Sequence, residues 1–377
     1  MIEINDKHKC CGCAACVQSC PKQCISFVMD YEGFSYPLVD KDRCIDCHLC
    51  ERVCPCLNQN NQVLPLLVTV AYNHQADVRY KSSSGGLFAI FAEKIIMEGG
   101  IVFGARFDKN WNVVHDYTES LDGLNVFLGS KYVQSSIGES YKQVKCFLKN
   151  DRKVLFSGTP CQIAGLKKFL RKEYEKLFTV EVVCHGVPSP IVWKSYLDYV
   201  NPQHEIITNI NFRDKSRGWK KYSYLINTSG KTIVDDYASS SLYLKGFSLN
   251  LTLRPSCYKC PTKEMKSSAD ITLGDCWGVE NIRDIKDDDK GLSVVVINTH
   301  RGENMFNELA VSCHTVNFDF VKKYNPSIYY QTKEPYCRDV FWQNFHKYGI
   351  IAVDMVIRKL NNPIYRLINK IRTKIRK

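Results

Sequence analysis

Short apolar runs and longer stretches with a helical period follow one another along the part of the chain after residue 60. Runs rich in β-branched residues predict buried strands, and apolar residues at steps of three and four predict helices. The predicted strands are 66–72, 101–106, 113–117, 153–157, 177–183 and 292–298, and the predicted helices are 87–96, 141–148 and 163–174. Residues 206–250 resemble strands and turns. Strands that alternate with helices indicate an α/β domain.

Cysteines follow directly after two of these strands. Cys161 stands in the turn Gly158-Thr-Pro-Cys-Gln, and Cys184 begins Cys-His-Gly after the next strand. Sites in α/β domains lie at the carboxyl ends of strands. A Cys-x2-Cys pair, Cys257 and Cys260, comes later, and Cys276 offers another thiol. Spacing alone leaves two interpretations open, a shared metal site and separate buried thiols.

The region before residue 60 has a different pattern, because it contains the same four-cysteine run twice. Each run reads C-x2-C-x2-C-x3-C-P, and the second lies 34 residues after the first. In two-cluster ferredoxins, the fourth cysteine of each run binds the cluster of the other run. The predicted ligands of the first 4Fe–4S cluster are Cys10, Cys13, Cys16 and Cys54, and those of the second are Cys44, Cys47, Cys50 and Cys20.

Disulfides and zinc are the alternatives for these eight cysteines. Disulfides suit exported proteins, and the N-terminus MIEINDKHKC has no apolar signal region. Zinc sites use Cys-x2-Cys pairs that a longer gap separates. Two iron–sulfur clusters are therefore predicted, with Cys11, Cys24 and Cys56 as bystander thiols.

A serine- and glycine-rich turn precedes the helix predicted at 87–96. The segment Lys81-Ser-Ser-Ser-Gly-Gly has the composition of a phosphate cradle, since helix N-termini offer free N–H groups. A Ser-Gly pair before a helix is, however, more often an ordinary helix cap. No G-x-G-x-x-G is present, so a Rossmann NAD site has no support.

Together these motifs resemble those of the coenzyme F420-reducing hydrogenase/dehydrogenase β-subunit family, which includes the 7-hydroxymethyl chlorophyll a reductases. The matching segments begin at Ser84 (SGGL), Gly129 (GSKYVQSS), Gly158 (GTPCQ), Val183 (VCHG), Cys257 (CYKC) and Ala269 (ADITLGD). The resemblance implies a third 4Fe–4S cluster on Cys161, Cys184, Cys257 and Cys260. It also implies FAD bound by Ser84, Gly85, Gly86, Lys131 and Tyr132. Catalytic residues stay unknown.

The expected fold is a small α+β two-cluster ferredoxin domain followed by a larger α/β flavin and iron–sulfur domain. The domain prediction is 1–60 for the ferredoxin-type domain, 61–354 for the catalytic domain and 355–377 for a basic amphipathic tail. The expected function is that of an FAD-dependent iron–sulfur oxidoreductase, which passes electrons between clusters and a small organic hydride donor or acceptor, coenzyme F420 or another. The alternative is a non-catalytic electron-transfer subunit of a larger complex.

Charge and hydropathy determine the expected partners and location. Eight basic residues and no acidic ones lie in 355–377, which leaves about +4 of the net +12 for the rest. That distribution argues against a nucleic-acid-binding face. The clusters and the resemblance imply that the partners are a ferredoxin or other redox protein and the organic substrate. A cytoplasmic location is expected, with nineteen cysteines kept as thiols or ligands.

The tail itself supports two hypotheses. Its apolar residues recur at helical spacing opposite the basic ones, which is typical of a helix at a membrane surface. Peripheral contact with the inner membrane face is one hypothesis, and a helix packed on the protein's own core is the other. Pro363 interrupts the pattern. The apolar positions are Ile357, Leu360, Ile364, Ile368, Ile371 and Ile375.

Overall fold

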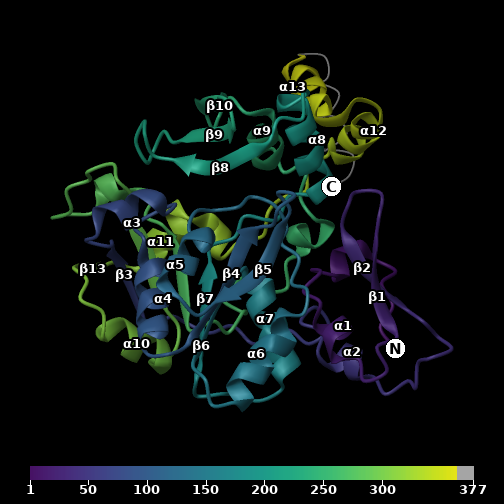
Figure 1. The fold of residues 1–377 in the computed structure, drawn as a ribbon, viewed down its shortest axis with the longest axis horizontal. Helices are drawn as coiled ribbons and strands as arrows, with labels where there is room; N and C mark the ends of the chain where they lie inside the picture. Colours follow the sequence, from purple (N-terminus) through teal and green to yellow (C-terminus); the bar gives the residue numbers. More distant parts are fainter. Residues whose placement is uncertain (363–377) are drawn as a thin grey trace.

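A central sheet of eight strands organises the structure, a computed structural model that describes residues 1–362 (Figure 1). The strand order is β13-β3-β12-β11-β7-β6-β4-β5. The four strands β4, β6, β7 and β11 run parallel, and β5, β12 and β13 pair antiparallel with their neighbours. The bounds are β3 Leu67–Ala71, β4 Ile101–Phe107, β5 Val113–Thr118, β6 Val154–Gly158, β7 Leu177–Val182, β11 Ile271–Asp275, β12 Ser293–Ile297 and β13 Cys313–Thr315.

Helices cover both faces of this sheet, which is why its inner strands are largely apolar. Every residue of β12 is buried. On one face, α4 (Leu87–Met97) and α10 (His300–Asn307) pack against the strands through Phe91, Ile95 and Phe306. On the other face lie α6 (Ser140–Lys149), α7 (Pro160–Leu170) and α11 (Phe318–Tyr324). The short helices α3 (Ala76–Lys81) and α5 (Leu121–Leu124) complete this part.

A second, three-stranded sheet lies across the carboxyl end of the parallel strands (Figure 1). It consists of β8 (Ile207–Asp214), β9 (Ser223–Thr228) and β10 (Thr232–Tyr237). With α8 (Pro190–Val200), α9 (Leu242–Ser248), α12 (Arg338–Tyr348) and α13 (Ala352–Asn361), it encloses a core of aromatic rings. The rings of Phe212 and Tyr224 stack at 5.0 Å between their centroids. This layer covers the carboxyl-end edge of the central sheet, where the turns that carry Cys161 and Cys184 lie.

The N-terminal module, residues 1–60, packs beside α7 rather than standing apart (Figure 1). Its elements are α1 (Ala15–Ser19), α2 (Leu49–Arg52) and a hairpin of β1 (Ile25–Met29) with β2 (Ser35–Val39). Buried Ala15 and Val53 belong to the same apolar cluster as Ile163 and Leu166 of α7. The module therefore shares a core with the larger domain.

Two sequence predictions of local structure are wrong in detail. The strands and turns expected across 206–250 include a helix, α9, because the Ser241 side chain accepts a hydrogen bond from the Leu244 amide and caps it. The helix predicted at 163–174 runs from Pro160 to Leu170. It begins early at a capping box and ends where Arg171 takes a left-handed conformation.

The described part of the tail packs on the protein. Ala352, Val353 and Val356 of α13 are buried in the aromatic core, and Ile357 and Leu360 pack against it. This contact agrees with the hypothesis of a helix packed on the protein's own core. Pro363, Ile364, Ile368, Ile371 and Ile375 lie outside the described residues. Among residues 1–362, no helix is long and apolar enough to cross a membrane.

Candidate metal centres

The first predicted cysteine set is gathered inside the N-terminal module. The loop Cys10–Ala14 winds tightly, with positive φ at Gly12 and Ala14, and α1 then carries Cys16. All four cysteines of the set are buried, and neighbouring thiols of the set help to raise one another's pKa values. The set consists of Cys10, Cys13, Cys16 and Cys54. Burial raises the pKa of Cys10 to about 11. Grouped thiols of this kind release their protons only when a metal compensates the charge, so the set suits a cluster.

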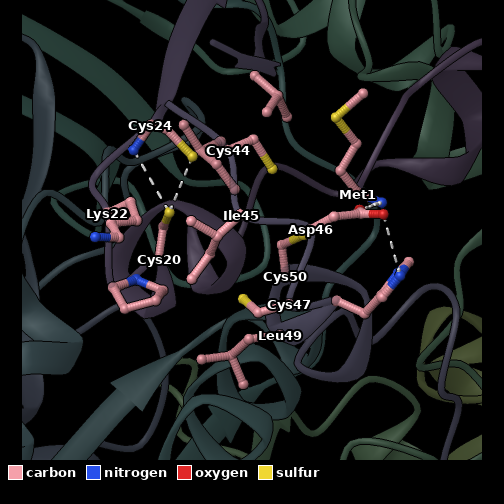
Figure 2. Close-up of a pocket in the computed structure, with 14 residues that line it drawn as sticks. Met1, Cys20, Lys22, Cys24, Cys44, Ile45, Asp46, Cys47, Leu49 and Cys50 are labelled. Carbon is pink, nitrogen blue, oxygen red and sulfur yellow. Dashed lines mark hydrogen bonds and ion pairs between the residues drawn. The ribbon is translucent and has the colours of Figure 1, made fainter. Parts of the chain in front are cut away.

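The second predicted set lines one pocket together with an unexpected fifth cysteine (Figure 2). Cys24 contributes that thiol. Its Sγ lies 3.4 Å from the Sγ of Cys20, and its backbone amide donates to the same sulfur at 3.4 Å. The prediction that Cys24 is a bystander thiol stays a prediction, but its sulfur lies beside the predicted site. The cysteines in this pocket are Cys20, Cys24, Cys44, Cys47 and Cys50.

The position of Cys24 leads to a test by paired substitution. We expect Cys20→Ser alone to retain a large part of the second cluster, because the Cys24 thiolate can take the vacated iron. The double variant Cys20→Ser/Cys24→Ser should lose about four irons, one cluster. Iron and sulfide quantitation after anaerobic reconstitution measures both, with Cys24→Ser as the control of full content. If Cys20→Ser alone lost as much iron as the double variant, the Cys24 thiolate could not replace that of Cys20 as a ligand.

The third set converges from three separate parts of the chain onto another pocket. Cys161, Cys184, Cys257 and Cys260 all line it. Cys161 follows β6 and Cys184 follows β7, and these neighbouring parallel strands end at the same edge. Cys257 and Cys260 come from the 3-10 turn Pro255–Lys259 and the residue after it. The Val187 amide donates to the Cys257 sulfur at 3.4 Å. Burial raises the pKa of Cys184 to about 12.

Local sequence explains how the Gly158-Thr-Pro-Cys-Gln turn presents its cysteine. Thr159 is the N-cap of α7, Pro160 occupies the first helical position and Gln162 closes a capping box. The Gln162 side-chain oxygen accepts from the Thr159 amide at 2.9 Å. Cys161 thus sits in the first turn of a helix, where the dipole favours a thiolate, but the neighbouring Cys11 thiol and burial raise the pKa of Cys161 well above the ordinary thiol value.

Cys11 joins the first and third cysteine sets. It is 6% exposed, lines the third pocket and belongs to the same apolar cluster as Cys13 and Cys161. The prediction that Cys11 is a bystander thiol stays a prediction, and its position places it beside both candidate centres. Cys276 lies elsewhere, fully buried beside Trp219 and Val279. In residues 1–362 no three His, Cys, Asp or Glu side chains lie close enough together to hold a single metal ion.

The segments that the resemblance assigned to FAD lie side by side. The Ser130 amide donates to Ser83 Oγ at 2.6 Å, which joins the Ser-Gly turn to the Gly129–Tyr132 segment. The turn itself is fastened to β12, since Ser84 Oγ donates to the Leu292 carbonyl at 2.8 Å. Gly85 has no room for a side chain, because an added Cβ would lie 2.7 Å from the Ala71 carbonyl oxygen.

Lys131 and Tyr132 are positioned from this segment. The ammonium of Lys131 donates to the carbonyls of Leu128 at 3.0 Å and Gly129 at 3.1 Å. The residue as a whole is half-buried, but its ammonium is enclosed, and burial lowers the lysine pKa to about 7. The ring of Tyr132 contacts Phe247 at 5.3 Å, and Phe247 in turn contacts His185 at 5.2 Å. These ring contacts connect the Gly129–Tyr132 segment with His185, the residue next to Cys184.

Sequence reasoning missed a charged group beside Tyr132. Arg213, 4% exposed, binds Asp275 through two hydrogen bonds of 2.9 and 3.2 Å and donates to the Tyr132 hydroxyl at 3.3 Å. Its Nε has no hydrogen-bond partner among the described residues. Asp275 ends the Ala269–Asp275 segment that the resemblance highlighted. Arg213 carried no signal, because it is one of several basic residues in a stretch without a motif.

Comparisons with known proteins identify the two parts of the chain. Residues 9–58 match the model for a 4Fe-4S dicluster domain, and residues 151–318 match the model for the C terminus of the coenzyme F420 hydrogenase/dehydrogenase beta subunit. The chain therefore contains a region similar to the C terminus of the coenzyme F420 hydrogenase/dehydrogenase beta subunit, behind a region that matches a 4Fe–4S dicluster domain. The predicted family is thus confirmed. The fold of a ferredoxin-type domain followed by a larger mixed α/β domain is confirmed with it.

One curated relative is the coenzyme F420-dependent sulfite reductase of Methanocaldococcus jannaschii. It is 23% identical over 340 residues, which cover 85% of this chain and 49% of the relative. The chain therefore spans about half the length of that protein. A solved structure, the F420-reducing NiFe hydrogenase complex from Methanosarcina barkeri, aligns over 71% of this chain and 90% of its own, with 17% identity and a TM-score of 0.47.

Proposed function

We propose that the chain is an iron–sulfur flavoprotein oxidoreductase, which passes electrons between its ferredoxin-type clusters and a small organic hydride donor or acceptor through FAD. The convergence of Cys161, Cys184, Cys257 and Cys260 on one pocket, with Cys11 linking that pocket to the first set, is the observation that carries the proposal. Four half-buried thiols from distant segments suit one further 4Fe–4S cluster. The similarity of residues 151–318 to a hydrogenase/dehydrogenase subunit, and the similarity of the chain to a coenzyme F420-dependent sulfite reductase, support a redox function.

The chain's own residues would hold the flavin at the covered edge of the sheet. When bound, FAD exchanges two electrons with an organic hydride partner and single electrons with clusters. Unpartnered polar atoms nearby fit such a group. The side-chain amide nitrogen of Asn73 is buried without a partner in the described structure, and Asn73 lies against Gly86 of the turn. The free Nε of Arg213 beside Tyr132 is a second.

Anaerobic purification followed by quantitation of iron, sulfide and flavin tests the proposal. We expect about twelve irons and one FAD per chain, four irons for each cluster. Twelve irons with no flavin after FAD reconstitution would instead favour a non-catalytic electron-transfer subunit. F420, and other organic redox substrates, can then be offered to the loaded protein to identify the hydride partner.

Lys131 should stabilise the reduced, anionic flavin by a charge-assisted hydrogen bond. Because burial lowers its pKa to about 7, the fraction that carries a proton rises as the pH falls through 7. We expect Lys131→Met to weaken FAD binding roughly tenfold and to lower the flavin midpoint potential. The difference in potential between wild type and variant should grow below pH 7 and shrink above it.

Flavin titration and potentiometry from pH 6 to 9, about one unit below to two above that pKa, measure this effect. Exposed Lys109→Met is the matched control, because it removes the same charge from the surface. Unchanged flavin content and potential in Lys131→Met would refute the role of Lys131.

A further inference from the structure

We propose that Arg254 and Gln134 form a buried clamp that locks the first-cluster loop onto the third cysteine pocket, and that the Arg254 charge raises the reduction potentials of both clusters. The proposal rests on the proposed function in one respect, the presence of the third cluster. Arg254 is a positioning residue and electrostatic group in this scheme.

The side chain of Arg254 forms hydrogen bonds with the first-cluster loop, the segment Cys10–Ala14 that carries two of the predicted ligands. It is 1% exposed. Its Nε donates to the Cys10 carbonyl at 2.7 Å, and its Nη2 lies 3.6 Å from the Cys10 sulfur and donates to the Ser35 carbonyl at 2.9 Å. Its Nη1 donates to the Gln134 side-chain oxygen at 3.1 Å. Gln134 then donates to the Cys11 carbonyl at 3.2 Å. Two side chains therefore hold consecutive carbonyls of the loop.

The backbone of the same arginine holds the third pocket. The Cys257 amide donates to the Arg254 carbonyl at 2.9 Å, and the Arg254 amide donates to the Val187 carbonyl at 3.0 Å. The amide of Val187 bonds the Cys257 sulfur. One residue thus connects a predicted ligand of the first cluster to a predicted ligand of the third through hydrogen bonds and a single side chain.

Gly12 is a glycine because of this clamp. An added Cβ would lie 2.8 Å from Arg254 Nη1 and 2.9 Å from Gln134 Nε2, and Gly12 has φ +70°. Both the close approach and the left-handed backbone exclude larger residues. The glycine within the first Cys-x2-Cys step therefore admits the guanidinium to the loop.

The charge of Arg254 lacks the partner that other buried arginines have. Within residues 1–362, no carboxylate pairs with it, and its acceptors are carbonyls, an amide oxygen and a thiol. The rings of Tyr36 and Phe34 lie 4.4 and 5.4 Å from its guanidinium carbon. Three other buried arginines bind carboxylates, namely Arg79 with Asp288, Arg213 with Asp275 and Arg338 with Glu32.

An unpaired buried charge is costly, so Arg254 needs a counter-ion. A cluster held by four thiolates is anionic and becomes more negative when it takes up an electron. The fixed guanidinium stabilises the reduced form more than the oxidised form, which raises the midpoint potential. One electron moves between the clusters, and no bond is made or broken.

Arg254→Gln and Arg254→Lys in the full chain test the proposal. After anaerobic reconstitution and iron quantitation, EPR-monitored redox titration gives the cluster potentials. We expect Arg254→Gln to shift the potentials of the first and third clusters downward and to leave the second unchanged. Arg254→Lys should restore most of the shift, because it keeps the charge. Titration of Arg254→Gln in a Cys257→Ser background assigns the signals, since that background lacks the third cluster.

If Arg254→Gln loses iron, the variant Gln134→Glu tests the effect on the cluster potentials instead. It keeps the acceptor for Arg254 and adds a negative charge beside the guanidinium, so the same two potentials should fall. Arg106→Gln, which removes a charge paired with Asp116, is the control and should leave all potentials unchanged. Unchanged potentials in an iron-replete Arg254→Gln, or in Gln134→Glu, would overturn the proposal. Flavin is assayed in the same samples. A missing flavin would contradict the proposed function and would leave the inference about Arg254 unaffected.

Discussion

Cys257→Ser should yield a folded chain that retains about eight of about twelve irons, because it loses one 4Fe–4S cluster of three. Cys257 is held by hydrogen bonds at both its amide and its sulfur. Its amide donates to the Arg254 carbonyl and its sulfur accepts from the Val187 amide. Burial raises its pKa well above the ordinary thiol value. The hydroxyl of serine is a poor substitute for a thiolate on iron.

Iron and sulfide content with EPR of the reduced protein measures the loss, and Cys276→Ser is the matched control. Cys276 is a fully buried thiol in a different apolar cluster, so its variant should keep every iron. A full complement of iron in Cys257→Ser would show that the third pocket holds no cluster on this residue. Loss of iron in Cys276→Ser would reassign the ligands.

Arg338→Met should destabilise the protein by about 3–5 kcal/mol, the cost of leaving one buried charge without its partner. Arg338 of α12 and Glu32 of the N-terminal module are 7% and 1% exposed. Arg338 Nη1 donates to Glu32 at 2.6 Å, and Nε donates to the Tyr258 hydroxyl at 3.1 Å. The pair joins residues that are 306 positions apart, so its loss weakens the attachment of the module.

The midpoint of urea-induced unfolding of the metal-loaded chain measures this effect. Lys7→Met is the matched control, because Lys7 pairs with Asp30 while 38% of its side chain is exposed. A pair of that kind contributes under about 1 kcal/mol. The double variant Glu32→Leu/Arg338→Met should recover much of the stability, since it leaves no uncompensated charge. Equal midpoints for Arg338→Met and wild type would contradict the assigned role.

Local pattern was enough to predict much of the framework. Strands β3 and β12 of the central sheet are almost entirely apolar because helices cover both faces, and this property is visible in the chain itself. Helix α9 was missed because its signal is a single capping serine in a region of strand-like residues. The dicluster domain at 9–58 was evident because its cysteine spacing is set by the geometry of a cube that a short loop must surround.

The sequence by itself determined the two repeated cysteine runs, the order of strands and helices around the third set, and the family. Only the tertiary structure decided which other residues face those sites. Cys11 and Cys24 look like any stray thiol in the chain, yet one lies between two centres and the other faces Cys20. Arg254 and Arg213 belong to no motif. Their roles come from contacts across more than a hundred positions in one case and sixty-two in the other, and such contacts leave no periodic trace in a sequence.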